Sequence, residues 1–379
     1  MRLTIPRQMV TIEPRVYDRQ PGFTIMTGAT RVHSSDRGGI MAGRVRDAVL
    51  AKLQNNKGQY LSGEKLSDQL GVSRAAVWKA IRGLREEGYP IEAMTNRGYL
   101  LPDSPEVITE EEIRRYLPAR YRDNGLYLFD VLDSTNNKAR QLAAEGGQVH
   151  GSTVIALQQT GGKGRLGRNF FSPKEGIYFS IIIRPDFDLR RSVLVTVAAA
   201  AAVAEAIESV SGQRARIKWV NDVYVGGKKV CGILTEGITD FESGQIDHLV
   251  IGIGINTTTK GFPKELQDIA GAVEGEYSRP ALVAGVITRV LDYLGNIEAR
   301  EFLQSYRRKS MLIGEDVMVF RGVYRQNPEE EMDGRPARVT GIDEDGGLKV
   351  IYTDGTRETL VTGEVTVRRT GEKQSPPQA

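Results

Sequence analysis

The chain contains little cysteine and histidine. Its 379 residues include one cysteine, Cys231, and three histidines that lie far apart. A single cysteine excludes an internal disulfide and is typical of a reducing compartment. Histidines without ligand spacing argue against a metal site formed by protein side chains alone. We therefore expect a cytoplasmic protein in which Cys231, within the stretch Val230–Leu234, is a buried strand residue.

A strong net charge and long hydrophobic runs are also lacking. The net charge is +3, so any nucleic-acid role must be confined to part of the chain. The most apolar stretch, Val193–Ile207, is alanine-rich, contains Glu205 and falls short of the ~20 residues that span a membrane. The first residues carry arginines and prolines where a signal peptide needs an apolar run. We expect a core helix at Val193–Ile207 and no membrane partner.

The length predicts two to three domains between two poorly patterned ends. Residues 1–40 show no sustained period and are expected to be an extension outside the folded protein, with Met41 as the true start. Residues 370–379 are expected to be a disordered tail. The three domains are expected at residues 41–105, 106–310 and 311–369.

The first of these domains has the pattern of a winged helix-turn-helix. Apolar spacing predicts helices at Val45–Leu53 and Glu64–Leu70, and Ser73 is positioned to cap a third helix. Two short strands at Pro90–Met94 and Gly98–Leu101 would form the wing. This order of elements is typical of a DNA-binding module.

The basic excess of the chain lies in this domain. From Met41 to Leu101 there are ten Lys or Arg and six Asp or Glu, a net charge of +4. Small residues at the start of the third helix permit close approach to a DNA groove, and cations can contact phosphates or bases. The candidate DNA-binding residues are Ser73, Arg74, Ala75, Ala76, Trp78, Lys79 and Arg82. Winged helices also dock onto proteins, which is the alternative.

The rest of the chain alternates helices and strands, and then turns to strands alone. Gly226–Gly227 predicts a tight hairpin, which favours a mixed or antiparallel sheet over an all-parallel one. Past Gly314, short strands separated by turns at Asp345–Gly347 and Asp354–Gly355 predict a small β-barrel. The expected fold class is therefore α+β, with several domains.

The segment Gly162–Arg168 combines three glycines with three cations, which suits it to closing on an anion. Its glycines also satisfy G-x-G-x-x-G, but Phe170–Pro173 follows instead of the helix that a dinucleotide site needs. A Walker A loop fails because Gly164 follows Lys163, and the partner motifs of kinases are missing. An anion-binding loop between two strands remains, with a solvated surface turn as the alternative.

Lys218 lies at the end of a strand predicted at Arg216–Val220. Its neighbours Ile217 and Trp219 imply a buried strand, where a charge needs an anionic partner. A fixed cation near the glycine loop suggests a site that makes or breaks a phosphate anhydride. A plain surface lysine is the alternative.

Four ordered motifs resemble those of the bifunctional biotin–protein ligase and biotin operon repressor family. They are Asp133–Asn136, the Q-T-x-G-R-G-R-x-G-R signature at Gln159–Arg168, the K-W-P-N-D motif at Lys218–Asp222, and the G-I-G-I-N strand at Gly252–Asn256. The resemblance covers about Met41 to Arg369. It implies a winged helix-turn-helix, a central class II synthetase-like mixed-sheet catalytic domain and an SH3-like C-terminal barrel.

The resemblance also implies the ligands and partners. Biotin and ATP would form biotinyl-5′-adenylate with Mg²⁺ present, and a biotin carboxyl carrier protein would accept biotin on a lysine. Operator DNA and, with the adenylate bound, a second copy of the chain would be the other partners. Catalytic roles would fall to Lys218 and Arg165. Biotin would be bound by Ser134, Thr135, Asn136, Gln159, Lys163, Gly164, Arg165 and Lys218, and the nucleotide by Gly162, Arg168, Phe170, Asn221 and Asn256.

Three residues depart from the family pattern. Lys163 replaces an arginine and loses its bidentate fork, Phe170 replaces a tryptophan and offers less stacking area, and Val220 replaces a proline. Two other functions are alternatives to a biotin–protein ligase. A lipoate ligase should lack the winged helix, and a transcription factor with a degenerate ligand domain should have lost Lys218 or Gln159.

Overall fold

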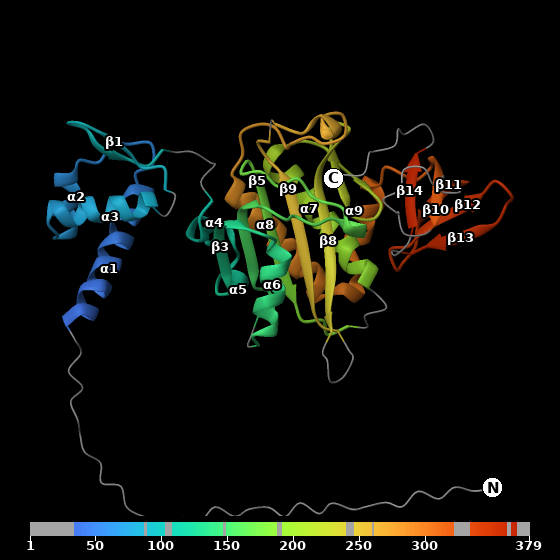
Figure 1. Ribbon diagram of the computed structural model, residues 1–379, viewed down its shortest axis with the longest axis horizontal. Coiled ribbons are helices and arrows are strands. Elements are labelled where there is room, and N and C mark those ends of the chain that lie inside the picture. The colour runs from blue at the N-terminus through green and yellow to red at the C-terminus, as the bar shows by residue number, and fades with distance from the viewer. Residues whose placement is uncertain are drawn as a thin grey trace, which may run out of the picture. The chain divides into compact units, whose positions relative to one another are not determined.

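The computed structural model divides into two compact units, with the division between Pro102 and Asp103 (Figure 1). The residues it describes are 34–86, 89–102, 108–146, 149–187, 192–239, 246–259, 261–321, 334–361 and 365–369. Residues 1–33 of the predicted extension 1–40 and the predicted tail at residues 370–379 lie outside the described residues.

The N-terminal unit forms three helices and a two-stranded sheet within its described residues. They are α1 (Ser34–Gln54), α2 (Gly63–Leu70), α3 (Arg74–Glu86), β1 (Glu92–Met94) and β2 (Gly98–Leu100). The Ser62 hydroxyl caps α2 by accepting from the Lys65 N–H, and Gly71 ends it in the left-handed conformation. This order confirms the predicted helix-turn-helix, although α1 begins at Ser34, before Met41.

The wing is tied to the segment that precedes α2. Leu61 and Tyr99 exchange two backbone hydrogen bonds of 2.8 Å. A Cβ on Gly98 would lie 2.2 Å from the Leu61 carbonyl oxygen, and the φ of Gly98 is 101°. Only glycine permits both the close approach and this backbone angle, so Gly98 fixes the wing to the start of α2.

The larger unit is built on a mixed sheet. Its seven described strands lie in the order β3-β4-β5-β9-β8-β7-β6. Strands β3 and β4 run parallel, and the other neighbouring pairs are antiparallel. The strands are β3 (Leu126–Leu132), β4 (Thr153–Gln159), β5 (Gly176–Ile183), β6 (Ala215–Lys218), β7 (Asp222–Val225), β8 (Lys228–Thr239) and β9 (Ile246–Asn256). The mixed sheet confirms the prediction made from the hairpin at Gly226–Gly227.

Helices cover both faces of this sheet (Figure 1). They are α4 (Glu110–Tyr116), α5 (Ala119–Arg122), α6 (Thr135–Ala144), α7 (Ser192–Ser211), α8 (Arg279–Gly295) and α9 (Glu301–Lys309). Helix α6 packs on one face, beside Val154, Ile182 and Val250. Helix α7 packs on the opposite face with α8 and α9.

Helix α7 is the predicted core helix. Its segment Val193–Ser211 is long and apolar enough to span a membrane, but 72% of the apolar window is buried inside the protein. Ala198–Ala202 have no exposed surface. Small side chains allow the helix to lie close to the sheet and to α8, which explains the alanine-rich sequence.

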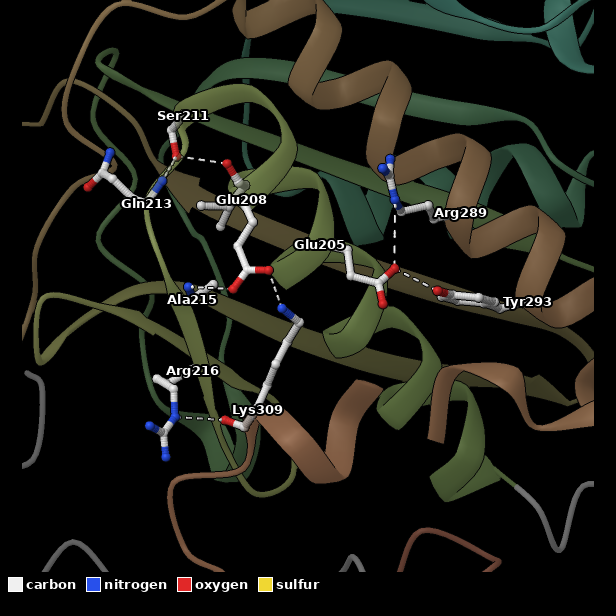
Figure 2. Close-up of polar contacts among 10 residues, drawn as sticks. Glu205, Glu208, Ser211, Gln213, Ala215, Arg216, Arg289, Tyr293 and Lys309 are labelled. Atoms are coloured by element: carbon white, nitrogen blue, oxygen red, sulfur yellow. Dashed lines mark hydrogen bonds and ion pairs between the residues drawn. The ribbon is translucent and has the colours of Figure 1, made fainter. Parts of the chain in front are cut away.

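Polar contacts hold the edge strand β6 to the helical layer (Figure 2). Glu208 of α7 accepts a 3.0 Å hydrogen bond from the Ala215 N–H and pairs with the Lys309 ammonium group at the end of α9. Arg216 donates to the Lys309 carbonyl oxygen over 3.2 Å. These contacts fix β6 on its open side, and Lys218 is the last residue of this strand.

A second sheet follows near the C-terminus. Strands β10 (Asp316–Arg321), β11 (Gly334–Ile342), β12 (Leu348–Tyr352), β13 (Arg357–Leu360) and β14 (Val365–Arg369) form a five-stranded antiparallel sheet in the order β13-β12-β11-β10-β14. This arrangement is consistent with the predicted small barrel. The Trp219 indole N–H donates to the Gly346 carbonyl oxygen over 3.0 Å, so the turn between β11 and β12 anchors the residue after Lys218.

Candidate active site

One row of residues crosses the larger sheet on the face that carries α6. The cross-strand partners in this row are Lys218, Asp222, Gly232, Gly254 and Tyr178. Directly paired residues point to the same side of a sheet, so Lys218 and Asp222 share this face with both glycines. Because Gly232 and Gly254 have no side chains, the backbone of β8 and β9 forms the surface of the sheet at this point. We call these two residues the glycine floor.

The Phe170 ring covers this glycine floor. A Cβ on Gly254 would lie 2.5 Å from Phe170 Cε1, and one on Gly232 would lie 2.9 Å from Cε2. The ring also meets the Tyr178 ring edge to face, with centroids 6.3 Å apart. Glycines at both positions are therefore required by an aromatic ring that lies flat against the strands.

The glycine loop is a paired ribbon. The Phe170 N–H donates to the Gly162 carbonyl oxygen over 2.9 Å, and the Gly164 N–H donates to that of Arg168 over 2.6 Å. A short 3₁₀ turn, Arg165–Gly167, closes the tip. This pairing gives the ribbon a defined shape that the sequence alone did not indicate.

A polar cluster joins β4 to the start of α6. Gln159 Oε1 accepts from the Thr135 N–H over 2.8 Å and lies 3.2 Å from the Thr135 hydroxyl. Ser134 is the N-cap residue of α6, but its side chain makes no capping hydrogen bond. Ser180 Oγ lies 2.8 Å from Thr135 Oγ1, which ties the helix to β5. The structure thus brings together Ser134, Thr135 and Gln159, which come from two of the four motifs, and adds Ser180, which no motif contains.

Asn136 packs into the same cluster with its polar atoms already bonded. Its amide nitrogen donates to Glu236 Oε2 over 2.7 Å, and its oxygen lies 2.6 Å from Ser180 Oγ. A Cβ on Gly252 would lie 2.2 Å from Asn136 Oδ1. Asn136 therefore packs against Gly252 and forms one side of the cluster.

The cations of the ribbon differ in their surroundings. Arg165 is half-buried, with Nη1 3.5 Å from Asn221 Oδ1. Burial lowers the pKa of the Arg165 guanidinium, an effect that the charge of Asp222 opposes. Lys163 is exposed and donates to Asn137 Oδ1 over 3.4 Å, and Arg168 is also exposed. Arg165 is thus the ribbon cation that gains most from an anion bound beside it.

Lys229 lies in the candidate site, although the sequence did not predict it there. Its Nζ lies 2.7 Å from Asp222 Oδ1, and its Cε lies 3.5 Å from the Cβ position of Gly232. A bulge in β8 explains this placement, because Val223 pairs with Cys231 whereas Tyr224 pairs with Lys229. Val230 and Cys231 are both buried in the core, and Lys229 turns to the opposite face, where the candidate site lies.

Asn256 presents an acceptor beside the glycine floor. It lies two residues after Gly254, on the same face of β9, and 5% of its surface is exposed. Its amide nitrogen donates to the Gly271 carbonyl oxygen over 3.0 Å. Within the described part of the chain, Asn256 Oδ1 is buried without a hydrogen-bond partner. An amino group entering the site would satisfy it.

The exposed face of α3 forms a separate candidate DNA-binding surface. Val77, Ile81 and Leu84 are buried, which turns the opposite side of the helix to solvent. Trp78 is 56% exposed, with the Arg82 guanidinium 5.8 Å from its ring centroid. The predicted DNA-contacting residues are exposed except for Ala76, which is half-buried; the exposed ones are Ser73, Arg74, Ala75, Trp78, Lys79 and Arg82.

Two family sequence models match the chain. The model of the biotin/lipoate A/B protein ligase family matches residues 128–256, the range that contains the ribbon and the glycine floor. The model of an HTH domain matches residues 45–100, which run from the second half of α1 to the end of β2.

The chain is also similar to known ligases over most of the length of those proteins. It is 39% identical over 254 residues to the bifunctional ligase/repressor BirA of Bacillus subtilis, covering 66% of this chain and 77% of that protein. It is 28% identical over 330 residues to BirA of Escherichia coli, covering 84% and 96%. The biotin protein ligase from Aquifex aeolicus in complex with biotin and ATP superposes with a TM-score of 0.52 and 26% identity, over 65% of this chain and 99% of that chain.

A helix-turn-helix unit followed by this mixed sheet defines a ligase that carries its own DNA-binding module. The chain belongs to the bifunctional ligase/repressor family.

Proposed function

We propose that this chain forms biotinyl-5′-adenylate from biotin and ATP, transfers biotin to a lysine of a biotin carboxyl carrier protein, and represses biotin genes by binding operator DNA. One observation carries the ligase proposal. The start of α6, the glycine ribbon and the lysines beside Asp222 converge on one face of the sheet. The names of the relatives and the bound ligands of the Aquifex aeolicus enzyme support the same conclusion.

Biotin would bind at the start of α6. The Gln159 amide nitrogen carries two hydrogens, of which one is bonded to Ser172, so one remains for the polar ring of biotin. Ser134 and Thr135 offer hydroxyl groups, and Asn136 forms one side of the cluster. The biotin carboxylate would then extend toward the ribbon and β6, where its proposed contacts are Lys163, Gly164, Arg165 and Lys218.

The nucleotide would bind over the glycine floor. Adenine is proposed to stack on the Phe170 ring and to donate from its amino group to Asn256 Oδ1, which is otherwise unsatisfied. Gly162, Arg168 and Asn221 would complete this side of the site.

The first reaction brings two anions together. A biotin carboxylate oxygen attacks the α-phosphorus, and the bond from that phosphorus to the bridging oxygen of pyrophosphate breaks. Lys218, Lys229 and Arg165 would stabilise the negative charge that develops on the phosphate oxygens. In the second reaction the acceptor lysine nitrogen attacks the biotinyl carbonyl carbon and AMP leaves. The ribbon would exclude water, which would otherwise hydrolyse the mixed anhydride.

Mg²⁺ is the expected counter-ion of ATP. Within the described ranges, no group of three or more His, Cys, Asp or Glu side chains could hold a metal. Since Mg²⁺ is commonly held by substrate phosphates with one or two protein ligands, we assign the ion no separate step.

Repression would use the exposed face of α3. Bound adenylate is proposed to favour a homodimer, which would present two α3 helices to a palindromic operator. Ultracentrifugation with and without biotin and ATP tests this coupling, and an unchanged sedimentation coefficient would reject it.

One assay tests the ligase proposal directly. The chain is incubated with ATP, biotin and a biotin carboxyl carrier domain, and the product is probed with streptavidin. We expect labelling that requires ATP and the acceptor lysine. Labelling that fails with biotin, while lipoate is attached to its own acceptor domain, would support a lipoate ligase instead.

A further inference from the structure

The hydroxyl group of Ser172 joins the two halves of the proposed site. Ser172 Oγ accepts a 3.1 Å hydrogen bond from Gln159 Nε2 and donates over 2.7 Å to the Phe170 carbonyl oxygen. The Ser172 carbonyl oxygen also accepts from the Gln159 N–H over 3.1 Å. Only 6% of the Ser172 surface is exposed, so water does not readily replace this hydroxyl.

Gly162 leaves room for the hydroxyl. A Cβ at this position would lie 2.4 Å from Ser172 Oγ and 2.6 Å from the Phe170 carbonyl oxygen. Neither contact is sterically possible for a larger residue without moving the ribbon. The first glycine of the cationic motif is therefore explained by the close approach of Ser172.

The bond to Ser172 also fixes the orientation of the Gln159 amide. Gln159 Oε1 accepts from Thr135, and Nε2 points to Ser172. Because an amide presents an acceptor on one side and donors on the other, these two partners allow one orientation. A chain of hydrogen bonds thus runs from α6 through Gln159 and Ser172 to the backbone of Phe170.

We propose that Ser172 is a positioning residue that couples biotin binding at Gln159 to nucleotide binding at Phe170. The proposal rests on the proposed function, which assigns biotin to Gln159 and adenine to Phe170. Biotin that holds the Gln159 amide also holds the Ser172 hydroxyl and, through it, the Phe170 carbonyl group. The aromatic ring is then already in place for adenine, so each ligand strengthens the binding of the other.

The coupling is measured as a ratio of dissociation constants. Titration calorimetry gives the biotin dissociation constant without and with saturating α,β-methylene ATP, whose methylene bridge prevents transfer of the adenylyl group to biotin. We expect the wild type to bind biotin more tightly with the analogue. The ratio should fall by about threefold to tenfold in Ser172→Ala, the effect of losing one hydrogen bond. Ser172→Thr, which keeps a hydroxyl group, should retain the ratio.

A matched variant separates coupling from a general effect of losing a buried hydroxyl. Ser305 in α9 is 7% exposed, and within the described residues its hydroxyl has no hydrogen-bond partner. Ser305→Ala should leave the ratio unchanged. An unchanged ratio in Ser172→Ala, or an equal fall in Ser305→Ala, would overturn the proposal. If Ser172→Ala does not fold, the same ratio is measured in Ser172→Cys. It should also fall, because a thiol forms only weak hydrogen bonds.

Binding by the wild type distinguishes a failure of the coupling from a failure of the proposed function. A wild type that binds neither biotin nor the analogue contradicts the proposed function. A wild type that binds both with a ratio of one leaves that function standing and overturns the role of Ser172.

Discussion

Lys229 Nζ lies 2.7 Å from Asp222 Oδ1, and Asp222 is also the cross-strand partner of Lys218. One carboxylate therefore stands beside two lysines on the floor of the candidate site. The ion pair orients the Lys229 ammonium group and compensates the half-buried charge of Asp222. An anionic substrate can then compete with Asp222 for the Lys229 ammonium group.

The first prediction concerns these two lysines. Lys218→Ala should abolish adenylate formation and Lys229→Ala should slow it, because both lysines lie on the face that carries the glycine floor. Removing one group that stabilises developing charge typically lowers turnover about 10²- to 10³-fold. Pyrophosphate release from purified variants is the measurement. Lys228→Ala is the matched control, since Lys228 is exposed and donates to the Gln267 carbonyl oxygen. Wild-type rates in both Lys218→Ala and Lys229→Ala would contradict the assignment.

The alternation of side chains along a strand explains why the strand position of Lys218 was predicted and why the position of Lys229 was not. Lys218 belongs to a regular strand, so its neighbours predict its environment. In β8, alternation from buried Cys231 places Lys229 on the core face, and the bulge at Val230 reverses this. A bulge depends on how two strands pair, which no local pattern reveals. Only the unfavourable position of a lysine on a core face could have signalled it.

The fold was predicted best where local signals agreed. Helix α2 (Gly63–Leu70) and strand β2 (Gly98–Leu100) lie within one residue of the predicted limits, because apolar spacing and the neighbouring turn residues coincide. The glycine loop was predicted as a loop between two strands, but the hydrogen bonds that pair its two sides were not predicted. Its shape depends on the Phe170 ring resting on Gly232 and Gly254, which come from strands far along the chain.

The second prediction tests the glycine floor. Gly254→Ala should displace the Phe170 ring, since the added Cβ would lie 2.5 Å from the ring. ATP affinity should fall, as it should in Phe170→Ala, by the roughly 0.5–1.5 kcal/mol typical of aromatic stacking. Phe170→Trp should raise the affinity if the ribbon accommodates the larger ring. Equilibrium binding of ATP measures all three. An affinity that Phe170→Ala leaves unchanged would remove Phe170 from the nucleotide site.

The third prediction concerns retention of the adenylate. Arg165→Ala should release more free biotinyl-5′-adenylate, because the half-buried guanidinium would no longer hold the phosphate. Arg165→Lys should restore little retention, since an ammonium group lacks the bidentate fork. Chromatography of the free and bound adenylate after one turnover gives the fraction retained. Full retention by Arg165→Ala would refute the assignment.

The fourth prediction separates two kinds of DNA contact on α3. Lys79→Ala should weaken binding to all DNA sequences. The slope of the logarithm of the binding constant against the logarithm of the salt concentration should become shallower by about one, as expected when one phosphate contact is lost. Trp78→Ala should instead change the preference among sequences with the salt dependence retained. Binding titrations at several salt concentrations, with biotin and ATP present, distinguish these outcomes. Equal salt slopes for wild type and Lys79→Ala would exclude the phosphate contact.

The last prediction concerns the anchor of β6. In Lys309→Met, Glu208 keeps its bond from the Ala215 N–H but loses the ammonium group (Figure 2). Because Glu208 remains one-third exposed, we expect a loss of about 1–3 kcal/mol in the free energy of unfolding, rather than the larger cost of a fully buried charge.

The double variant Glu208→Gln/Lys309→Met should recover part of this loss, since no unpaired carboxylate remains. Chemical denaturation gives both values, with Lys349→Met as the control for an exposed lysine. If the pair anchors β6, Lys309→Met should also slow adenylate formation, because Lys218 is the last residue of that strand. A loss of stability with unchanged adenylate formation would show that the anchor supports the fold without positioning Lys218.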